Sequence, residues 1–203
     1  MGKIKFTKGE LKKQRDALKQ FGRYLPTLQL KKQQLQIEIA HQRVALDEQK
    51  RSEAAKKRAA QIWSALLAEP IEIRPWIVPQ VHTDTRNIAG VDIPVFKQAE
   101  FPNAEYDLFA TPLWVDGAIE ALCALVVLGE QAKILEKGIA ILRQELRITT
   151  QRVNLFEKVK IPEAQEAIRR IKIYLGDQTA NAVGRSKIAK RKIEALVLQE
   201  VSG

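Results

Sequence analysis

Apolar side chains recur at alternating steps of three and four residues in two long stretches of the chain, and both stretches predict helices. This spacing is typical of a coiled coil, in which knobs from one helix enter holes of the other. Polar Lys32, Gln42 and Gln49 also lie on the first stripe, where they weaken the seam but can fix its register. The first apolar stripe consists of Leu18, Phe21, Leu25, Leu28, Leu35, Ile39 and Leu46. The second stripe consists of Leu135, Ile139, Leu142, Leu146, Thr149, Val153 and Phe156.

The segment between the two stretches, residues 69–112, has a different character, since it holds six of the eight prolines. Apolar and polar residues alternate around Trp76–Val81 and again over Ile88–Phe96, and the polar segment His82–Asn87 lies between them. Alternation on both sides of a polar segment predicts a short, irregular β-hairpin with its turn in His82–Asn87. The prolines restrict this hairpin to edge positions or ragged ends.

Two local signals mark helix starts. Thr7 and Glu10 have the spacing of a capping box, in which the Thr hydroxyl accepts from an amide and the Glu reaches back to the cap. Thr111 and Pro112 predict the start of the second helix, with Thr as its cap and Pro at the first helical position.

Three positions predict irregularities within the helices. Pro26 predicts a local bend and not an end of the first helix. Gly176 predicts a helix end or a weak point. Beyond Pro162 the apolar stripe resumes in a displaced position, at Ile168, Ile171 and Leu175.

These elements predict a mainly α fold: a long antiparallel two-helix coiled coil with a short irregular β-hairpin or loop block in the middle. Folding back through the middle block places Leu46 near Leu135 and Leu25 near Phe156, so the two stripes run alongside each other. We expect one elongated structural unit. Its parts are an N-terminal coiled-coil helix (residues 1–68), a proline-rich middle block (69–112) and a C-terminal coiled-coil helix with a basic tail (113–203).

The net charge of +10 is unevenly distributed. Residues 1–68 carry 16 basic and 6 acidic side chains, residues 69–112 carry 3 and 7, and residues 113–203 carry 15 and 11. Such a balance fits nucleic acid, an anionic membrane surface or an acidic protein partner. No aromatic residue is interleaved with the terminal lysines for base stacking. The C-terminal basic run contains Lys187, Lys190, Arg191 and Lys192.

The chain carries no constellation typical of an enzyme. Its glycines are scattered and form no phosphate-binding loop, and His41 and His82 are too far apart for a local metal motif. Glu163 and Glu166 are typical of a solvated helix face. The sequence therefore predicts no catalytic residue, no cofactor and no metal site.

Two further signals concern the core. Cys123, the single cysteine, lies in an apolar run and predicts a buried core thiol. Trp63, Trp76 and Trp114 lie at or near the junctions of the middle block with the arms, and they predict an apolar cluster that closes the hairpin end.

No segment has the pattern of a secretion signal or a membrane span. The N-terminus is charged and lacks the apolar region of a signal peptide. The longest apolar run, residues 121–129, is far shorter than the roughly 20 residues that span a bilayer. We expect a cytoplasmic protein without direct membrane insertion.

One segment resembles a known family. Residues 151–162 are similar to the signature of the D subunit of V-type and archaeal-type rotary ATPases, and the resemblance covers residues 7–67 and 113–175. In the N-terminal arm, members of this family tend to have an Arg-Gly pair and several acidic residues. This chain instead has Gly22-Arg23, in the reverse order, with Pro26 inserted and glutamines at positions where acids are common. The residues that carry the resemblance are Arg152, Val153, Asn154, Glu157, Ile161 and Pro162.

The resemblance implies a central rotor shaft that couples ATP hydrolysis or synthesis in a catalytic ring to proton or sodium transport. It implies a non-catalytic subunit without a cofactor, on the cytoplasmic face of the inner membrane as a peripheral part of the complex. The implied partners are the catalytic and regulatory ring subunits (A and B), the small F subunit of the stalk and the funnel-shaped subunit on the membrane rotor ring. Possible ring contacts are Lys187, Lys190, Arg191 and Lys192.

A second function remains open from the residues themselves. A basic coiled-coil adaptor or chaperone, for example a secretion-apparatus stalk or a nucleic-acid-associated protein, has the same charge and periodicity. Copurification separates the two hypotheses. A shaft is expected to copurify with a hexameric ATPase ring and a small partner. A salt-sensitive complex with nucleic acid would favour the adaptor or chaperone.

Overall fold

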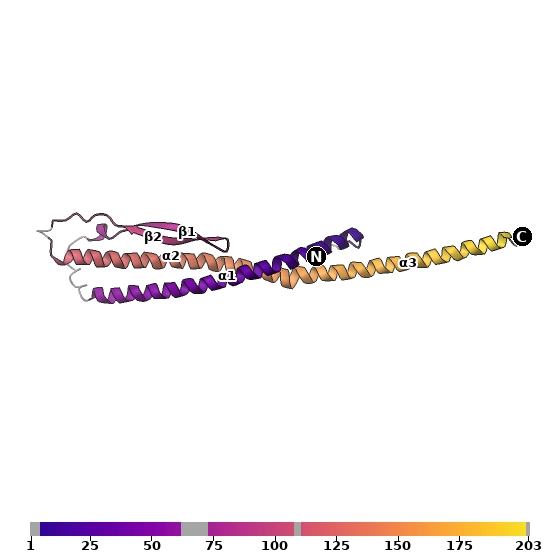
Figure 1. The fold of residues 1–203 in the computed structure, drawn as a ribbon, viewed down its shortest axis with the longest axis horizontal. Coiled ribbons are helices and arrows are strands. Elements are labelled where there is room, and N and C mark those ends of the chain that lie inside the picture. Colours follow the sequence, from indigo (N-terminus) through magenta and orange to yellow (C-terminus); the bar gives the residue numbers. More distant parts are fainter. Residues whose placement is uncertain (1–4, 62–72, 108–110, 202–203) are drawn as a thin grey trace. The chain divides into compact units, whose positions relative to one another are not determined.

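The structure is a computed structural model that describes residues 5–61, 73–107 and 111–201. The predicted fold class is confirmed, because long helices flank a two-stranded antiparallel sheet (Figure 1). The predicted end of the first helix near residue 68 lies outside the described residues. The elements are α1 (Lys8–Gln61), η2 (Arg74–Trp76), β1 (Gln80–Ile88), β2 (Val91–Glu100), α2 (Trp114–Leu155), η3 (Phe156–Lys160) and α3 (Ile161–Val201).

The chain forms two compact units, and α1 contributes to both. We call Leu30–Thr150 the hairpin-covered unit, and Met1–Gln29 together with Gln151–Gly203 the terminal unit.

In the hairpin-covered unit, α1 and α2 pair antiparallel. Lys31 Nζ lies 2.8 Å from Glu145 Oε1, whereas Lys50 Nζ lies 2.7 Å from Glu136 Oε1, so a later residue of α1 meets an earlier residue of α2. The strands lie alongside α2 as a third layer (Figure 1). The buried core joins all three layers and consists of Leu35, Ile39, Ile93 and Leu142, with Ile88, Ala89, Val91 and Leu146 packed against it.

Gly138 on α2 faces β2. A Cβ at Gly138 would lie 3.9 Å from Ile93 Cβ and 3.9 Å from the carbonyl oxygen of Pro94. These are ordinary van der Waals distances, so the interface between α2 and β2 has room for a methyl group and does not depend on glycine at this position. Burying an aliphatic side chain such as Ile93 in this interface contributes about 1.5–3 kcal/mol.

The hairpin forms as predicted, but its turn does not lie in His82–Asn87, which belongs to β1. The turn is Ala89–Gly90, where φ is +52° and +76°. Positive φ at both central residues is the type I′ geometry that matches the twist of two paired strands. The Asn87 side-chain oxygen accepts a bond from the Gly90 amide at 3.1 Å and stabilises this turn.

The two strands pair over their full length, from Gln80 with Glu100 to Ile88 with Val91. The hairpin is therefore longer than the sequence predicts. It is irregular at one point, a bulge where His82 pairs with Gln98 and Thr83 with Phe96.

Helix α1 starts with the predicted cap. The Glu10 amide donates to Thr7 Oγ1 at 3.2 Å, which confirms the Thr half of the capping box. The Glu10 carboxylate instead accepts a bond from the Gln14 side chain at 2.8 Å. The helix continues through Pro26, as predicted, because one missing backbone bond in a helix of 54 residues does not outweigh the bonds on either side. The bend at Pro26 stays a prediction.

Helix α2 starts later than predicted. Its first residue is Trp114, and the Thr111 hydroxyl donates to the Asp107 carbonyl at 2.5 Å instead of capping α2. The Val115 amide donates to the Pro112 carbonyl at 3.1 Å, which joins the preceding turn to the helix. A local turn thus uses the Thr hydroxyl that the sequence assigned to the cap.

In the terminal unit, the start of α1 and α3 also run antiparallel. The ring centroids of Phe21 and Phe156 lie 5.4 Å apart, and those of Phe6 and Tyr174 lie 5.1 Å apart. The predicted helix end at Gly176 is wrong, because α3 continues to Val201. Gly176 keeps a helical backbone, and an isolated glycine there costs only about 1 kcal/mol relative to alanine.

None of the helices within residues 5–61, 73–107 and 111–201 is both long and apolar enough to cross a membrane.

Candidate functional site

The predicted seam residues lie at different depths in the two helix pairs. Six of them are buried and the others are half-buried, so the stripe faces the partner helix unevenly. The buried residues are Leu35, Ile39, Ile139, Leu142, Thr149 and Val153. The half-buried residues are Leu18, Phe21, Leu25, Leu28, Leu46, Leu135, Leu146 and Phe156.

The polar members of the first stripe make specific contacts. The Gln49 side-chain amide donates to the Gln131 side chain on α2, and the Gln42 amide donates to Glu38 at 2.9 Å. A Gln–Gln bond between helices is lost when either helix slips, so it favours one register. Gln42 and Gln49 also line an open cavity of about 270 Å³ beside β2.

The residues of the family-like motif surround a π-helical turn, η3. Pro162 has no amide to donate, and the Ile161 amide bonds to the Phe156 carbonyl, five residues back. Such a turn accommodates one extra residue in a helix. Val153 is buried and Ile161 half-buried, whereas the other four motif residues are exposed, namely Arg152, Asn154, Glu157 and Pro162.

The π-helical turn explains the displaced stripe beyond Pro162. Steps of seven from Leu142 through Thr149 and Phe156 lead to Glu163 and Arg170, which are exposed. The buried residues lie one position later, at Ala164 and Ile171, with Ala167 between them. The predicted displacement is therefore confirmed. Ile171 is fully buried, whereas Ile168 and Leu175 are half-buried.

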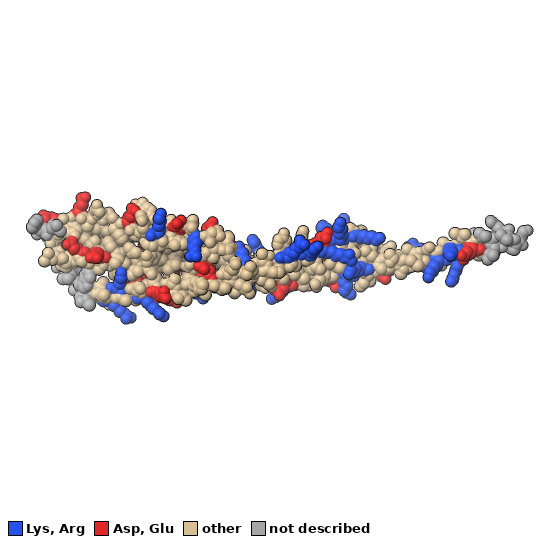
Figure 2. All heavy atoms as spheres, in the orientation of Figure 1, with Lys and Arg blue, Asp and Glu red and all other residues tan. Residues whose placement is uncertain are grey.

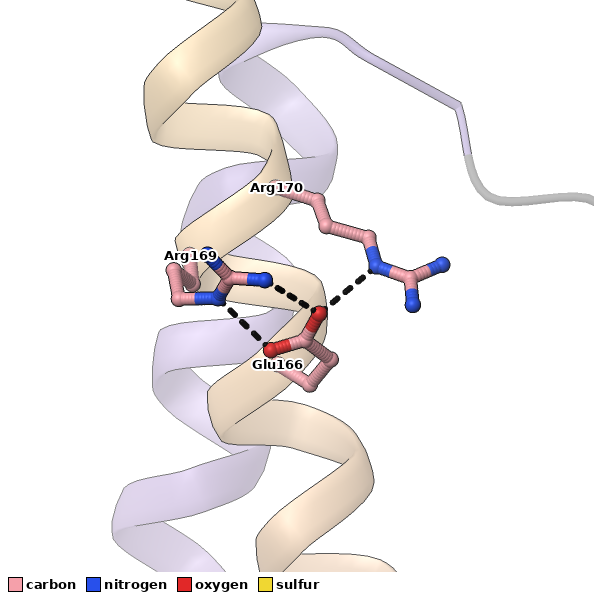
Figure 3. Close-up of polar contacts among 3 residues, drawn as sticks. All are labelled: Glu166, Arg169 and Arg170. Carbon is pink, nitrogen blue, oxygen red and sulfur yellow. Dashed lines mark hydrogen bonds and ion pairs between the residues drawn. The ribbon is translucent and has the colours of Figure 1, made fainter.

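An ion cluster follows on α3 (Figure 3). The Glu166 carboxylate accepts bonds from Arg169 Nε at 2.7 Å and Nη2 at 2.9 Å, and from Arg170 Nε at 2.8 Å. The hydrogen bonds from Arg169 and Arg170 lower the pKa of Glu166 to about 2. The cluster brings two exposed guanidinium groups to one carboxylate on α3. The sequence predicts Glu166 only as part of a solvated face, and the signal for the cluster is the pair of arginines at i+3 and i+4.

The distal part of α3 has no cover from the described residues of its own unit, since every residue from Gly176 to Ala195 is exposed. Its large apolar side chains, Val183, Ile188 and Ile193, are 55%, 59% and 61% exposed. They are five residues apart, so at about 100° per residue each points about 140° from the next. Apolar side chains therefore point to all sides of this helix.

The predicted contact residues lie on this uncovered segment. Lys187, Lys190, Arg191 and Lys192 are all exposed, and Lys190 Nζ lies 3.7 Å from Glu194 Oε1. Figure 2 shows basic side chains over the first part of α1, over the start of α3 and again towards the end of α3. The described basic side chains at the start of α1 include Lys8, Lys12 and Lys13, which are exposed.

An aromatic cluster lies near the start of α2. The rings of Trp76 and Tyr106 lie 5.2 Å apart, the Tyr106 hydroxyl bonds to Asp116, and the half-buried Cys123 thiol lies 3.9 Å from the Trp76 carbonyl oxygen. Burial raises the pKa of the Cys123 thiol, which disfavours the reactive thiolate.

The membership of this cluster differs from the three tryptophans that the sequence predicts. Tyr106 and Asp116 join it without a sequence signal of their own. Trp63 lies outside the described residues, and Trp114 is half-buried.

The two histidines lie on separate elements. His41 is exposed on α1, and His82 Nε2 on β1 lies 3.6 Å from Glu100 Oε2. Within the described ranges, no three His, Cys, Asp or Glu side chains are grouped so that they could hold a metal ion.

Comparison with known proteins gives consistent matches along the chain. Residues 10–191 match the family model for the D subunit of ATP synthase. The V-type ATP synthase D subunit of Borreliella burgdorferi is 48% identical over 194 residues, which is 95% of this chain and 96% of that protein. The V-type ATP synthase D subunit of Chlamydia trachomatis serovar L2 is 35% identical over 195 residues, 94% of this chain and 96% of that protein. The V-type ATP synthase D subunit of Chlamydia pneumoniae is 34% identical over 195 residues, which is 94% of this chain and 93% of that protein.

Proposed function

The chain belongs to the ATP synthase D-subunit family of rotary ATPase stalk subunits, and we propose that it is the central shaft of its complex. Rotation of this shaft couples ATP hydrolysis or synthesis in a catalytic ring to proton or sodium transport across the membrane. Family membership confirms the resemblance in the motif around Arg152–Pro162 and decides against the adaptor or chaperone alternative.

One observation supports a shaft in particular: the uncovered part of α3. Large apolar side chains on several sides of one helix are all buried only when other structure surrounds that helix. Val183, Ile188 and Ile193 point in three directions, so a partner on one side would leave at least one of them exposed. A ring of subunits encloses a helix from every side, and we infer that this segment lies inside such a ring.

The partners follow from this placement. The catalytic and regulatory ring subunits (A and B) enclose the distal α3, and its cations Lys187, Lys190, Arg191 and Lys192 meet polar or acidic groups of the ring. The small F subunit of the stalk and the funnel-shaped subunit of the membrane rotor bind elsewhere on the chain. The chain is a subunit of an ATPase complex, and within that complex we propose a non-catalytic role without a cofactor.

The location follows from the complex. As a V-type ATP synthase subunit, the chain is part of a membrane-associated assembly. We propose that it lies on the cytoplasmic side and is held at the membrane by its partners. The division into residues 1–68, 69–112 and 113–203 is retained as the proposed functional order, with the middle block towards the membrane rotor.

Rotation provides the direct test. The chain is reconstituted with its ring subunits, and a bead is attached through a Thr85→Cys substitution at an exposed position of β1. We expect ATP to drive continuous rotation of the bead in one direction. A ring that hydrolyses ATP with the chain bound, while the bead does not rotate, would contradict the shaft.

Charge reversal tests the ring contact separately. Replacing the four cations Lys187, Lys190, Arg191 and Lys192 by Glu is expected to weaken assembly with the ring. The matched control makes the same change in charge on α1, at the exposed residues Arg51, Lys56, Lys57 and Arg58. Equal assembly and equal ATP-coupled rotation in both variants would exclude the four α3 cations as ring contacts.

A further inference from the structure

The open cavity of about 270 Å³ beside β2 lies within the hairpin-covered unit. Its walls come from α1, α2 and both strands, and they combine one cation, three side-chain amides and apolar surface. At roughly 30 Å³ per water molecule of the liquid, a cavity of this volume has room for a molecule of about ten non-hydrogen atoms. None of the contacts proposed for the shaft involves this cavity.

Arg86 on β1 supplies the cation. It pairs with Ile93 across the hairpin, and paired residues of two antiparallel strands point to the same face of the sheet. Since Ile93 is buried in the core, Arg86 leaves β1 on the face towards the helices, where it lines the cavity. Among the residues that the structure describes, Arg86 has no hydrogen bond or ion pair. The carboxylate of Asp84, two residues earlier, instead accepts a bond from the Thr85 amide at 2.7 Å.

The Gln131 side chain on α2 supplies a second donor. Its oxygen accepts a bond from Gln49 on α1, and its amide nitrogen still has two hydrogens to donate. Neither of them has an acceptor in the described parts of the chain. The nitrogen of Gln42 is already used, because it donates to Glu38 at 2.9 Å. Two unused donors, one charged and one neutral, thus border the same cavity.

The rest of the cavity wall is apolar. Val95 is 38% exposed, Phe96 and Leu135 are half-buried, and all three line the cavity. Covering this surface with the apolar part of a ligand is favourable, since it removes apolar area from water. An inorganic anion would leave the same surface in contact with water.

The charge of the hairpin favours a ligand with a single negative charge. Residues 80–100 carry three acidic and two basic side chains, so their summed field opposes a multiply charged anion. One carboxylate matches one guanidinium both in charge and in the geometry of two parallel hydrogen bonds.

We propose that this cavity binds a small monocarboxylate with a compact apolar body, such as a short-chain fatty acid. The carboxylate accepts from Arg86 and Gln131, and the apolar body covers Val95, Phe96 and Leu135. Because α1, α2 and both strands contribute to the wall, the bound molecule bridges the hairpin and the helix pair and stabilises their packing. The proposal goes beyond the shaft function and does not depend on it.

A titration of the full chain with three ligands of equal length tests the chemistry of the site. Hexanoate, 1-hexanol and hexylamine are added at neutral pH to protein with labelled Ile and Leu methyl groups, and NMR follows Ile134 and Leu135, which line the cavity. We expect hexanoate to shift both resonances and to saturate at about millimolar concentration. The alcohol and the amine are expected to bind at least about tenfold more weakly, because neither makes the charge-assisted hydrogen bonds.

Substitution of Arg86 tests the anchor of the ligand. Its side chain is exposed, so Arg86→Gln is expected to keep the fold, which circular dichroism verifies, and to weaken hexanoate binding at least about tenfold. Arg86→Lys keeps the charge without the planar fork, and we expect an intermediate affinity. Arg51→Gln is the matched control, since it makes the same change of charge at an exposed residue of α1 outside the cavity wall. Its affinity should equal that of the unsubstituted chain.

Thermal unfolding gives a second measurement. A ligand that binds only the folded cavity raises the midpoint of unfolding as its concentration increases. We expect hexanoate to raise the midpoint of the unsubstituted chain and of Arg51→Gln, and to leave that of Arg86→Gln unchanged.

Three results would overturn the proposal and leave the shaft intact. Equal binding of hexanol and hexanoate would show an apolar cavity without an anion site. Equal affinity of the unsubstituted chain and Arg86→Gln for hexanoate would remove the anchor. Loss of hexanoate binding after assembly with the purified partner subunits would show that a protein side chain, not a small molecule, occupies the cavity.

Discussion

The hairpin-covered unit and the terminal unit use the same antiparallel helix pairing but bury it differently. In the first, the two strands add a third layer, and large residues such as Leu35, Ile93 and Leu142 are almost completely buried. In the second, the described helices α1 and α3 pack as two layers, and the rings Phe21 and Phe156 are only half-buried, although Ile171 and Val153 are buried. A two-helix seam has two open sides, and covering one of them converts a stripe into a core.

A core truncation tests this difference most strongly. Leu142→Ala is expected to lower the free energy of unfolding by about 2–5 kcal/mol, because a cavity remains where three layers meet. Ile141→Ala is the matched control at an adjacent residue that is 39% exposed, and we expect a loss of less than about 1 kcal/mol there. Urea unfolding measures both. Equal losses would mean that the hairpin contributes little to the core.

The turn tests whether the hairpin itself is held in place. Gly90 has φ of +76°, and Gly90→Ala is expected to cost about 1–2 kcal/mol because alanine disfavours the left-handed region. Gly129→Ala on α2 is the control, since that position has open space and helical backbone, and it should be neutral or stabilising by up to about 1 kcal/mol. Thermal unfolding compares the two. An unaffected Gly90→Ala variant would contradict the turn geometry.

A double-mutant cycle tests how the terminal unit is held without a third layer. Phe21→Ala and Phe156→Ala, alone and combined, are expected to give a coupling energy of about 0.5–1.5 kcal/mol, the range for a direct aromatic pair. A parallel cycle between Phe21 and Leu142, which lie in different units, should give additive losses. Strict additivity for the Phe21–Phe156 pair would show that the two rings do not interact.

The smallest effect is the pH response of the ion cluster on α3. The pKa of Glu166 falls from its ordinary value of 4.5 to about 2 when the chain folds. Its contribution to stability is thus complete above about pH 4.5 and is lost as the pH falls towards 2. Glu166→Gln should remove this part of the pH dependence, with Glu163→Gln as the control. Circular dichroism measures the stability of the helices in both variants as a function of pH. The same pH dependence in both variants would contradict the ion cluster.

The regular parts of the fold could be predicted because their signals repeat. The seam through Leu142 and Val153 repeats over many turns, so one polar residue hardly changes the periodicity. The turn at Ala89–Gly90 is hard to place because its signal is a single dipeptide with alanine, not Asn, at the first position with positive φ. The polar strand segment His82–Asn87 resembles a turn, because neither of its faces is fully buried.

The interaction surfaces were only partly predictable. Basic residues such as Lys187 are visible in the sequence, but their exposure on an uncovered helix depends on where the partner helix starts. The cavity beside β2 could not be predicted, because Arg86 falls in the predicted turn and reaches the cavity only in the register that pairs it with Ile93. The ion cluster at Glu166 depends on rotamers, which a residue pattern does not fix.

The π-helical turn at Phe156–Lys160 also sets an angular phase. One residue of an α-helix corresponds to a rotation of about 100°, so the extra residue determines which face of α3 points in a given direction around its axis. Deleting one residue from this turn would leave composition and charge almost unchanged, yet it would rotate every later side chain about the helix. If α3 turns inside a ring, as we propose, such a deletion would shift the timing of each contact along α3 without removing any of them.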